Sequence, residues 1–317
     1  MPTFKISEAA LNWSAFPVWI LIITAAGGIT NCIVLLAFLR ANSSYTPFNI
    51  YLINLILANL LRLLAVGPLD VAITLFDRWP FGYAACTYYV YMEYVISSAI
   101  THSHMLITVN RIWAVTFPVS YRSHHTKAVA FAICLATWIY INALLLPELI
   151  RDAMYYRFLL DIPYCLVNSS QSRTQWQLLT FTEFWFYTLP QVAIFFGFPY
   201  ILLKRRRRRQ VRAAQRENDL ALVNPSAAAG GNQTVRRRSG GYKVLTILTI
   251  TAGICWLPNT VYLKLGLLYR YSNTVFNQIG ATMMLLQATL DPIYITAGLE
   301  DIQTTLRGML RCTASQN

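Results

Sequence analysis

The chain has 317 residues, of which 56% are hydrophobic and 12% are charged. Soluble domains carry about 25% charged residues, so this chain lacks the polar side chains that a water-exposed surface requires, and its mean hydropathy of +0.44 agrees. The net charge of +13 could suggest nucleic acid, but 12 of the 26 Lys and Arg residues lie between Lys204 and Lys243, in one interruption between apolar runs. Such a segment usually faces the cytoplasm and its anionic lipids. Composition therefore predicts an integral membrane protein with membrane lipid, and no nucleic acid, as its partner.

Seven apolar runs of membrane-spanning length follow one another along the chain. A spanning helix needs about 20 mostly apolar residues, and the runs cover residues 17–39, 50–75, 86–114, 128–149, 178–203, 243–268 and 274–298. The third and seventh runs contain polar residues, which favours helices inside a bundle. The stretch 299–311 has apolar residues at helical spacing and is predicted to lie on the membrane surface. We therefore predict an all-α fold, in which residues 1–317 form one seven-transmembrane helix bundle with a C-terminal amphipathic surface helix.

The distribution of positive residues predicts the orientation of the chain. An extracellular N-terminus places most of them in cytoplasmic loops, among them Arg40, Arg122, Lys127 and the segment 204–243. The glycosylation sequons that begin at Asn12 and Asn168 then lie outside. Residues 210–241 join two basic clusters through a stretch rich in Gly, Ala and Asn, and we expect this third intracellular loop to be disordered.

Short motifs mark the predicted spans in order along the chain. They are Gly28-Ile-Thr-Asn31, Leu55-Ile-Leu-Ala58-Asn59, Trp79-Pro-Phe-Gly82, Asn110-Arg111-Ile-Trp113, Cys255-Trp256-Leu257-Pro258 and Asp291-Pro292-Ile293-Tyr294. With them, the chain resembles rhodopsin-like (class A) G-protein-coupled receptors along nearly its whole length. Each motif alone is weak, but their joint order on seven helices is highly specific.

The resemblance implies roles for several of these residues. Cys86 and Cys165 would form the family's disulfide, which would pin the second outer loop over the ligand cavity. Arg111 would receive the G protein, and Asn110 stands where the family has an acid that holds this arginine. The core switch would include Trp256 and the kink at Pro258, together with Asn59, Asp291, Pro292 and Tyr294. Asn59 and Asp291 exchange the family's usual residues, and Tyr294 is displaced by one position, so a sodium site and the tyrosine switch are both in question.

Glu93 carries the question of the ligand. It lies seven residues after Cys86, or about 10 Å into the membrane, at the position where the resemblance places the aspartate of amine receptors. Arg62 on the second span is costly unless paired, and Glu93 is a suitable partner. Two interpretations therefore stay open, a ligand anchor and a structural ion pair. The other candidate ligand-binding residues are Tyr94, Ser97, Ser98, Glu183, Trp256 and Asn259, and Asp70 is a further acidic candidate for the cavity wall.

These residues predict a plasma-membrane receptor that binds an extracellular ligand, an amine or a peptide, between its helices and activates a heterotrimeric G protein. A membrane transporter is the alternative, but it would show inverted repeats, and we find none. A membrane enzyme would need a convergent nucleophile–base pair or metal cluster. His102 and His104 lie two residues apart, on different helix faces, and are interpreted as core histidines, so we expect no metal, no cofactor and no enzymatic activity.

Overall fold

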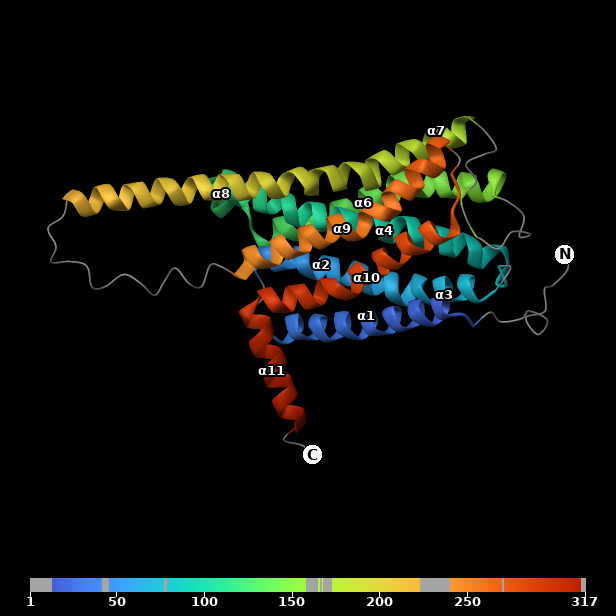
Figure 1. Cartoon of the computed structure of the whole chain (residues 1–317), viewed down its shortest axis with the longest axis horizontal. Coiled ribbons are helices and arrows are strands. Elements are labelled where there is room, and N and C mark those ends of the chain that lie inside the picture. Colours follow the sequence, from blue (N-terminus) through green and yellow to red (C-terminus); the bar gives the residue numbers. More distant parts are fainter. Residues whose placement is uncertain are drawn as a thin grey trace.

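A computed structural model describes residues 13–41, 46–76, 79–157, 165, 167, 173–222, 240–269 and 271–314. These residues contain helices and no β-strand, and seven helical spans lie side by side (Figure 1). In chain order the spans are α1 (Ala15–Arg40); α2 (Pro47–Leu61), η3 (Arg62–Val66) and α3 (Gly67–Leu75); α4 (Gly82–Thr116); α6 (Lys127–Arg151) and η4 (Asp152–Tyr156); α7 (Arg173–Thr182), η5 (Glu183–Thr188) and α8 (Leu189–Leu222); α9 (Gly240–Tyr269); and α10 (Thr274–Gly298). The short α5 (Pro118–His124) joins α4 to α6, and α11 (Glu300–Ala314) follows the last span. The predicted all-α bundle is confirmed.

Capping residues explain where several spans begin. The side chains of Thr46 and Thr126 accept hydrogen bonds from the backbone three residues later, at the starts of α2 and α6, and Asn273 does the same for α10. Pro47 occupies the first turn of α2, where its missing N–H costs nothing. These local signals place the starts of the helices at the loops, so the apolar stretches lie within the spans.

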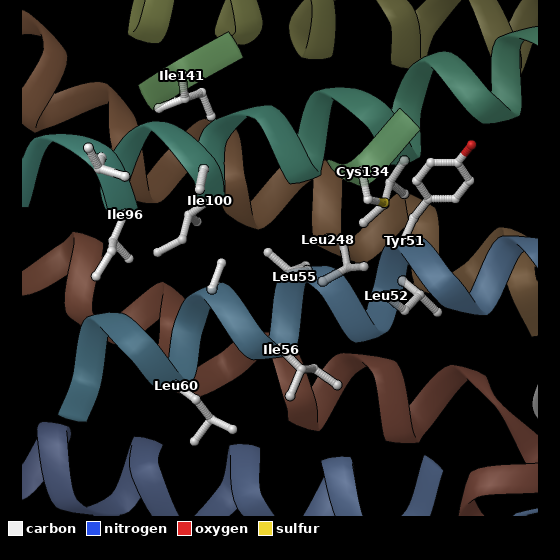
Figure 2. Packing of buried hydrophobic residues seen from close by; sticks show 14 of the residues in the cluster. Tyr51, Leu52, Leu55, Ile56, Leu60, Ile96, Ile100, Cys134, Ile141 and Leu248 are labelled. Atoms are coloured by element: carbon white, nitrogen blue, oxygen red, sulfur yellow. The ribbon is translucent and has the colours of Figure 1, made fainter. Parts of the chain in front are cut away.

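The two spans with most polar residues lie inside the bundle, as the sequence predicts. Five spans are long and apolar enough to cross a membrane by length and composition alone, but α4 and α10 are not among them. The polar residues of α4 are buried, including Ser97, His104 and Asn110, as is Asp291 on α10. Around them, aliphatic side chains of α2, α4 and α6 interdigitate (Figure 2). The apolar faces thus meet lipid while the polar faces meet one another.

A proline in the seventh span is compensated by a side chain from another span. Pro292 cannot donate to the carbonyl four residues earlier, which leaves the carbonyl of Ala288 without its usual helical partner. The Asn31 amide on α1 donates to the Ala288 carbonyl at 2.8 Å. This motif residue therefore ties the first span to the seventh at the proline.

The disulfide between Cys86 and Cys165 is present, as predicted. Their Cα atoms lie 5.6 Å apart, and both residues are buried. Cys86 lies in the second turn of α4, so the bond anchors the chain that follows the fourth span to the outer end of the third.

One expectation about the predicted third intracellular loop needs correction. Helix α8 continues to Leu222, through the first part of the range 210–241 that we expected to be disordered, and it projects far beyond the bundle (Figure 1). The reason is that Arg, Gln, Ala and Glu are strong helix formers, and the preceding span supplies the helical nucleus. Residues 223–239 lie outside the described residues, as do the predicted glycosylation sites Asn12 and Asn168.

The amphipathic helix α11 leaves the bundle at a steep angle to the spans (Figure 1). Ile302 is fully buried, and Leu306 and Met309 pack against the core. The predicted stretch 299–311 therefore agrees with this helix to within three residues at its end.

Candidate functional site

Three charged residues meet in the half of the bundle that contains the disulfide. The Arg62 guanidinium donates to Asp70 at 2.7 Å and lies 3.1 Å from a Glu93 carboxylate oxygen. Tyr89 donates to the second oxygen of Asp70 at 2.9 Å, and Ser97 donates to Glu93 at 3.1 Å. We call Arg62, Asp70 and Glu93 the outer charge cluster, and we name the two ends of the bundle outer and inner after the orientation that the sequence predicts.

The structure thus contains the ion pair between Arg62 and Glu93, one of the two interpretations that the sequence left open. It adds Asp70, which we expected on the cavity wall and which instead bonds the guanidinium directly. The local reason is the π-helical segment that begins at Arg62 and precedes Gly67-Pro68, since a π-helical turn shifts the residues that follow it around the helix axis. Spacing along an ideal α-helix could not have revealed this contact.

The outer charge cluster has an excess of negative charge. It contains two carboxylates and one guanidinium, and the Arg62 side chain is 7% exposed whereas that of Glu93 is 26% exposed. Asp70 makes the shorter contact and a hydrogen bond with Arg62, while the Glu93 oxygen that faces Arg62 makes only an ion pair and its other oxygen accepts from Ser97. The cluster therefore has the net charge to attract a further positive group near Glu93, the more exposed of its two carboxylates.

Other predicted ligand residues lie near Glu93 on α4 and on the facing fifth span. Ser97 and Ser98 are buried, and the Tyr187 hydroxyl donates to the backbone carbonyl of Tyr94 at 3.3 Å. Glu183 is buried at the start of η5, and one of its carboxylate oxygens has no hydrogen-bond partner in the regions that the structure describes. These residues line one side of the outer half of the bundle.

Asn259 and Trp256 occupy different positions on α9. Asn259 contacts α10, where a Cβ added to Gly280 would lie 3.0 Å from the Asn259 Cα, so the glycine permits a close approach of the two helices. Trp256 is buried, its ring centroid lies 6.4 Å from that of Tyr187, and it lines a cavity of about 240 Å³ between α8 and α9. Pro258 lies inside α9, two residues after Trp256.

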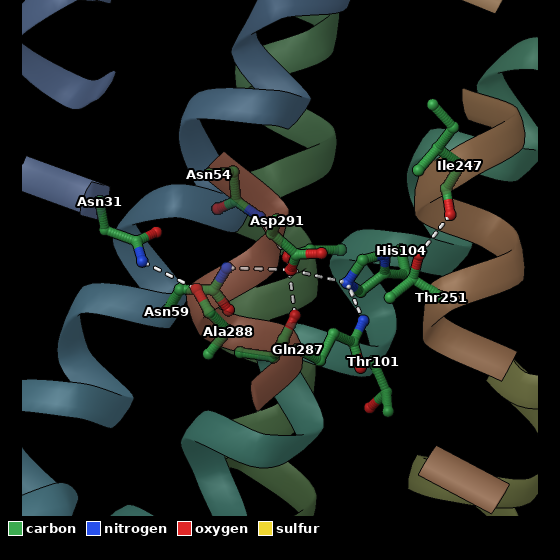
Figure 3. A network of polar contacts seen from close by, with 12 residues as sticks. Asn31, Asn54, Asn59, Thr101, His104, Ile247, Thr251, Gln287, Ala288 and Asp291 are labelled. Carbon is green, nitrogen blue, oxygen red and sulfur yellow. Dashed lines mark hydrogen bonds and ion pairs between the residues drawn. The ribbon is translucent and has the colours of Figure 1, made fainter. Parts of the chain in front are cut away.

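Asp291 is the centre of a polar network in the middle of the bundle (Figure 3). Asn59 donates to its carboxylate at 3.0 Å, and His104 Nε2 lies 3.2 Å from the same oxygen. Gln287 contacts His104 at 2.7 Å. His104 is thus buried and satisfied, as predicted for a core histidine, but sequence spacing did not identify it as the partner of Asp291.

The two oxygens of the Asp291 carboxylate have different surroundings. One is approached by an amide N–H of Asn59 and a ring nitrogen of His104, and the other has no hydrogen-bond partner among the described residues. The exchange of the family's usual residues therefore keeps the carboxylate in the core but gives it nitrogen partners. Of the two remaining switch residues, Pro292 is buried in α10 and Tyr294 packs against the hydrophobic core.

Arg111 and Asn110 diverge at the opposite end of α4. The Arg111 guanidinium carbon lies 3.3 Å from the ring centroid of Phe48, and its Nε has no hydrogen-bond partner among the residues described. Asn110 does not hold the arginine, although its position in the motif suggested that it would. Its amide nitrogen lies 2.8 Å from His125, and its oxygen accepts from the Tyr121 hydroxyl at 3.1 Å.

His125 forms the centre of an aromatic cluster that the sequence did not predict. Its ring stacks on those of Tyr51 and Tyr121, at centroid distances of 5.8 and 4.4 Å. Burial, and then the positive charge of Arg111, lower the pKa of His125 below its ordinary value of 6.5. Burial likewise raises the pKa of Tyr121. A neutral His125 can accept the hydrogen bond from Asn110, so the inner end of α4 is fastened to the loop while Arg111 stays available.

Comparison with known proteins agrees with this arrangement. The sequence pattern described as "7 transmembrane receptor (rhodopsin family)" matches residues 30–294. Similar proteins include a thyrotropin-releasing hormone receptor of Gallus gallus, 24% identical over 75% of this chain and 63% of that receptor, and melanopsin of Felis catus, 26% identical over 69% and 43%. The 5-hydroxytryptamine receptor 1D of Mus musculus is 30% identical over 47% of this chain and 40% of that receptor.

The chain spans less than two thirds of the length of each of these relatives. The family match nevertheless covers most of the chain and includes the spans that hold Asn31, Asn59, Arg111, Trp256 and Asp291. It describes a family of multi-pass plasma-membrane receptors rather than of transporters or enzymes. On this match and on its bundle of helical spans, the chain belongs to the rhodopsin family of seven-transmembrane receptors.

Proposed function

We propose that this receptor binds an extracellular ligand at the outer charge cluster and activates a heterotrimeric G protein through Arg111. The main support for this proposal is that one helix, α4, contains Glu93 of the outer charge cluster, His104 of the central network and Arg111 at the inner end. A change in the position of α4 at the ligand can therefore reach the inner surface within one rigid element. The N-terminus is extracellular in this proposal.

The activating step is a shift between two populations of the receptor. A ligand can favour the active state only by as much as it binds that state more tightly. Trp256 and Pro258 place a flexible point in α9 beside α4 and α8, and Arg111 rests on an aromatic ring rather than on a carboxylate. Because Arg111 forms no ion pair within the described residues, a modest differential affinity can release the arginine toward a G protein.

The ligand class that the outer charge cluster favours is a cation, such as an amine or a peptide with a basic group. The cluster holds two carboxylates and one guanidinium, and Glu93 is the more exposed of the two carboxylates. An ammonium or guanidinium at Glu93 would complete this balance through a charge-assisted bond. The name of one relative, a 5-hydroxytryptamine receptor, agrees with an amine.

Nucleotide exchange on purified G proteins tests the proposal. Purified receptor in lipid nanodiscs should accelerate exchange on at least one heterotrimer, and Arg111→Ala should remove the acceleration while thermal unfolding stays unchanged. Phe48→Leu is a matched variant that keeps an apolar contact under Arg111 and should retain most of the exchange. Equal exchange rates for the wild type and Arg111→Ala would refute the coupling role of this arginine.

A further inference from the structure

The cavity between α8 and α9 is separate from the outer charge cluster and from Arg111. The wall on α9 is formed by four residues that follow one another at intervals of one helical turn, Ala252, Trp256, Thr260 and Lys264. Gly253 and Leu257 lie beside them. The facing wall on η5 and α8 runs from Thr188 to Phe196. Two parallel stripes of this kind form a crevice along the helix axes, since residues four apart share one helix face.

One side of the crevice faces the membrane. Phe195, Phe196 and Leu257 line it, and they are 69%, 65% and 60% exposed. A Cβ added to Gly253 would meet no atom within 4 Å, so the inner part of the crevice contains open space. In a transmembrane span such exposed residues contact lipid, and a molecule that enters here comes from the bilayer.

The upper end of the crevice is polar and carries one positive charge. Lys264 donates to the Thr188 hydroxyl at 2.7 Å, and Gln191 and Thr260 bond each other across the two helices at 2.7 and 3.0 Å. Lys264 forms no ion pair with a carboxylate among the described residues, and it is the only Lys, Arg, Asp or Glu residue of this part of the chain that lines the crevice. An ammonium group in such a position favours an anionic partner.

The length of the crevice corresponds to one lipid chain. Lys264 and Gly253 are separated by 11 residues, or about 17 Å at the helical rise of about 1.5 Å per residue. Half the hydrocarbon thickness of a bilayer is about 15 Å, which is the reach of a single acyl chain. The site therefore combines one cationic head position with an apolar slot for one chain.

We propose that this crevice binds a long-chain fatty acid from the membrane. The carboxylate bonds Lys264, and the chain passes Val192 and Leu257 and ends beside Gly253. A single ammonium balances a single carboxylate, whereas a phosphate dianion would leave a negative charge unbalanced in the membrane. Because the chain lies against Trp256 and separates α8 from α9, bound fatty acid would influence the movement of α9. This second site does not depend on the ligand of Glu93 or on G-protein coupling.

Glu183 provides an internal check on this assignment. It lies on the same span as Thr188, whose hydroxyl donates to the Glu183 backbone carbonyl at 3.2 Å and accepts from Lys264 at 2.7 Å. A carboxylate at Glu183 opposes the binding of an anion nearby. Glu183→Gln should therefore strengthen fatty-acid binding, whereas a cationic or neutral occupant would bind more weakly or equally.

Photolabelling of the purified receptor in nanodiscs tests the proposal. The probe is myristic acid with a diazirine near the end of its chain, and the labelled peptides are identified by mass spectrometry. We expect labels on α8 between Val192 and Phe196 and on α9 between Gly253 and Leu257. Myristic acid should compete with the probe, and myristyl alcohol, which has the same chain without the charge, should compete roughly ten-fold less well because a charge-assisted bond is missing.

Matched variants connect the label to the crevice. Gly253→Leu fills the open space and should abolish labelling, whereas Ile254→Phe enlarges the neighbouring lipid-facing residue, which does not line the cavity, and should leave labelling unchanged. Lys264→Met should weaken binding roughly ten-fold or more, and Lys264→Arg should restore it. Thermal unfolding identifies any variant that fails to fold. If one does, the effect of Glu183→Gln on fatty-acid binding tests the proposal in its place.

Three results would overturn the proposal. They are labelling that survives Gly253→Leu in folded receptor, equal competition by the acid and the alcohol, and stronger competition by lysophosphatidic acid than by myristic acid. The first would place the probe elsewhere on the bundle. The second would make the occupant neutral, and the third would assign the head position to a phosphate.

Discussion

Arg62 joins two acidic residues that the sequence places on different helical segments, and its substitution separates structural from ligand-binding roles. Arg62→Met leaves two partly buried carboxylates together, and removal of one partner of a fully buried pair costs about 3–5 kcal/mol, which is the upper bound here. Glu93→Gln leaves Arg62 bonded to Asp70 at 2.7 Å, so its effect on stability should be much smaller. Thermal unfolding of detergent-purified receptor measures both.

A double variant provides the control for this prediction. Arg62→Met combined with Asp70→Asn removes the repulsion between the carboxylates and should recover most of the folded receptor. Glu93→Gln should keep its stability but lose response to a cationic agonist. If Glu93→Gln unfolds as readily as Arg62→Met, Glu93 is mainly a structural residue.

His125 makes the inner end of α4 sensitive to acid. Its pKa is lower in the folded receptor than its ordinary value of 6.5, so the unfolded chain binds more protons between the two values and stability rises with pH there. Unfolding temperature should therefore be constant above about pH 7 and fall as pH drops through about 6.5. His125→Asn should lose this dependence. A wild-type profile that is flat between about pH 5 and pH 8 would contradict it.

Contacts between side chains were the part of the site that sequence could not predict. Motif order identified Arg111, Asp291 and the disulfide, because each stands at a fixed place on a predicted span. The motifs did not predict that His104 contacts Asp291 or that His125 contacts Asn110, because these contacts depend on how the folded chain packs. The contact of Arg62 with Asp70 depends on a π-helical segment that no apolar pattern encodes.

The elements themselves were largely predictable. Apolar length gave all seven spans, and buried polar residues explain why α4 and α10 have weaker apolar signals. The end of α8 was not predicted, because its arginine-rich continuation has high helix propensity although its composition lacks a core-forming face. Apolar pattern detects helices that pack or face lipid, and it does not detect a helix that continues into water.

The bond between Asn31 and the Ala288 carbonyl predicts a specific energetic coupling between two elements. Asn31→Ala leaves this buried carbonyl without a partner, which costs about 1–3 kcal/mol. Pro292→Ala restores a backbone N–H four residues after Ala288. The double variant should therefore lose less stability than the sum of the losses in the two single variants. A double-mutant cycle by thermal unfolding measures the coupling, expected at about 0.5–3 kcal/mol.

Asn31 also donates to the carbonyl of Gly27, at 2.8 Å. Asn31→Ala removes this bond whether residue 292 is Pro or Ala, so its energy cancels in the double-mutant cycle. Strict additivity of the two substitutions would show that the Ala288 carbonyl is satisfied in another way.

The whole molecule has an orientation that glycosylation and epitope accessibility can measure. With the N-terminus outside, Asn168→Gln should remove one glycan and raise the electrophoretic mobility of receptor from mammalian cells. An epitope inserted at Gly230 should be detected only after the plasma membrane is permeabilised, because it follows the basic end of α8. Surface labelling of that epitope in intact cells would reverse the topology.

The disulfide fixes the outer surface of this same arrangement. Cys86→Ala frees the chain after η4 from α4, so surface expression and ligand binding should both fall. Cys134→Ala is a suitable control, because Cys134 is buried in α6 and is not disulfide-bonded. Equal surface expression of the two variants would show that the bond is dispensable for the outer fold.

The compensated proline has a consequence for how related sequences can diverge. A lineage that loses Pro292 regains the helical bond to Ala288 and no longer requires the amide of Asn31, whereas a lineage that loses Asn31 first carries a defect until the proline is also replaced. The two positions should therefore covary across homologues, and the intermediate that keeps the proline without its donor should be the rarest of the four combinations.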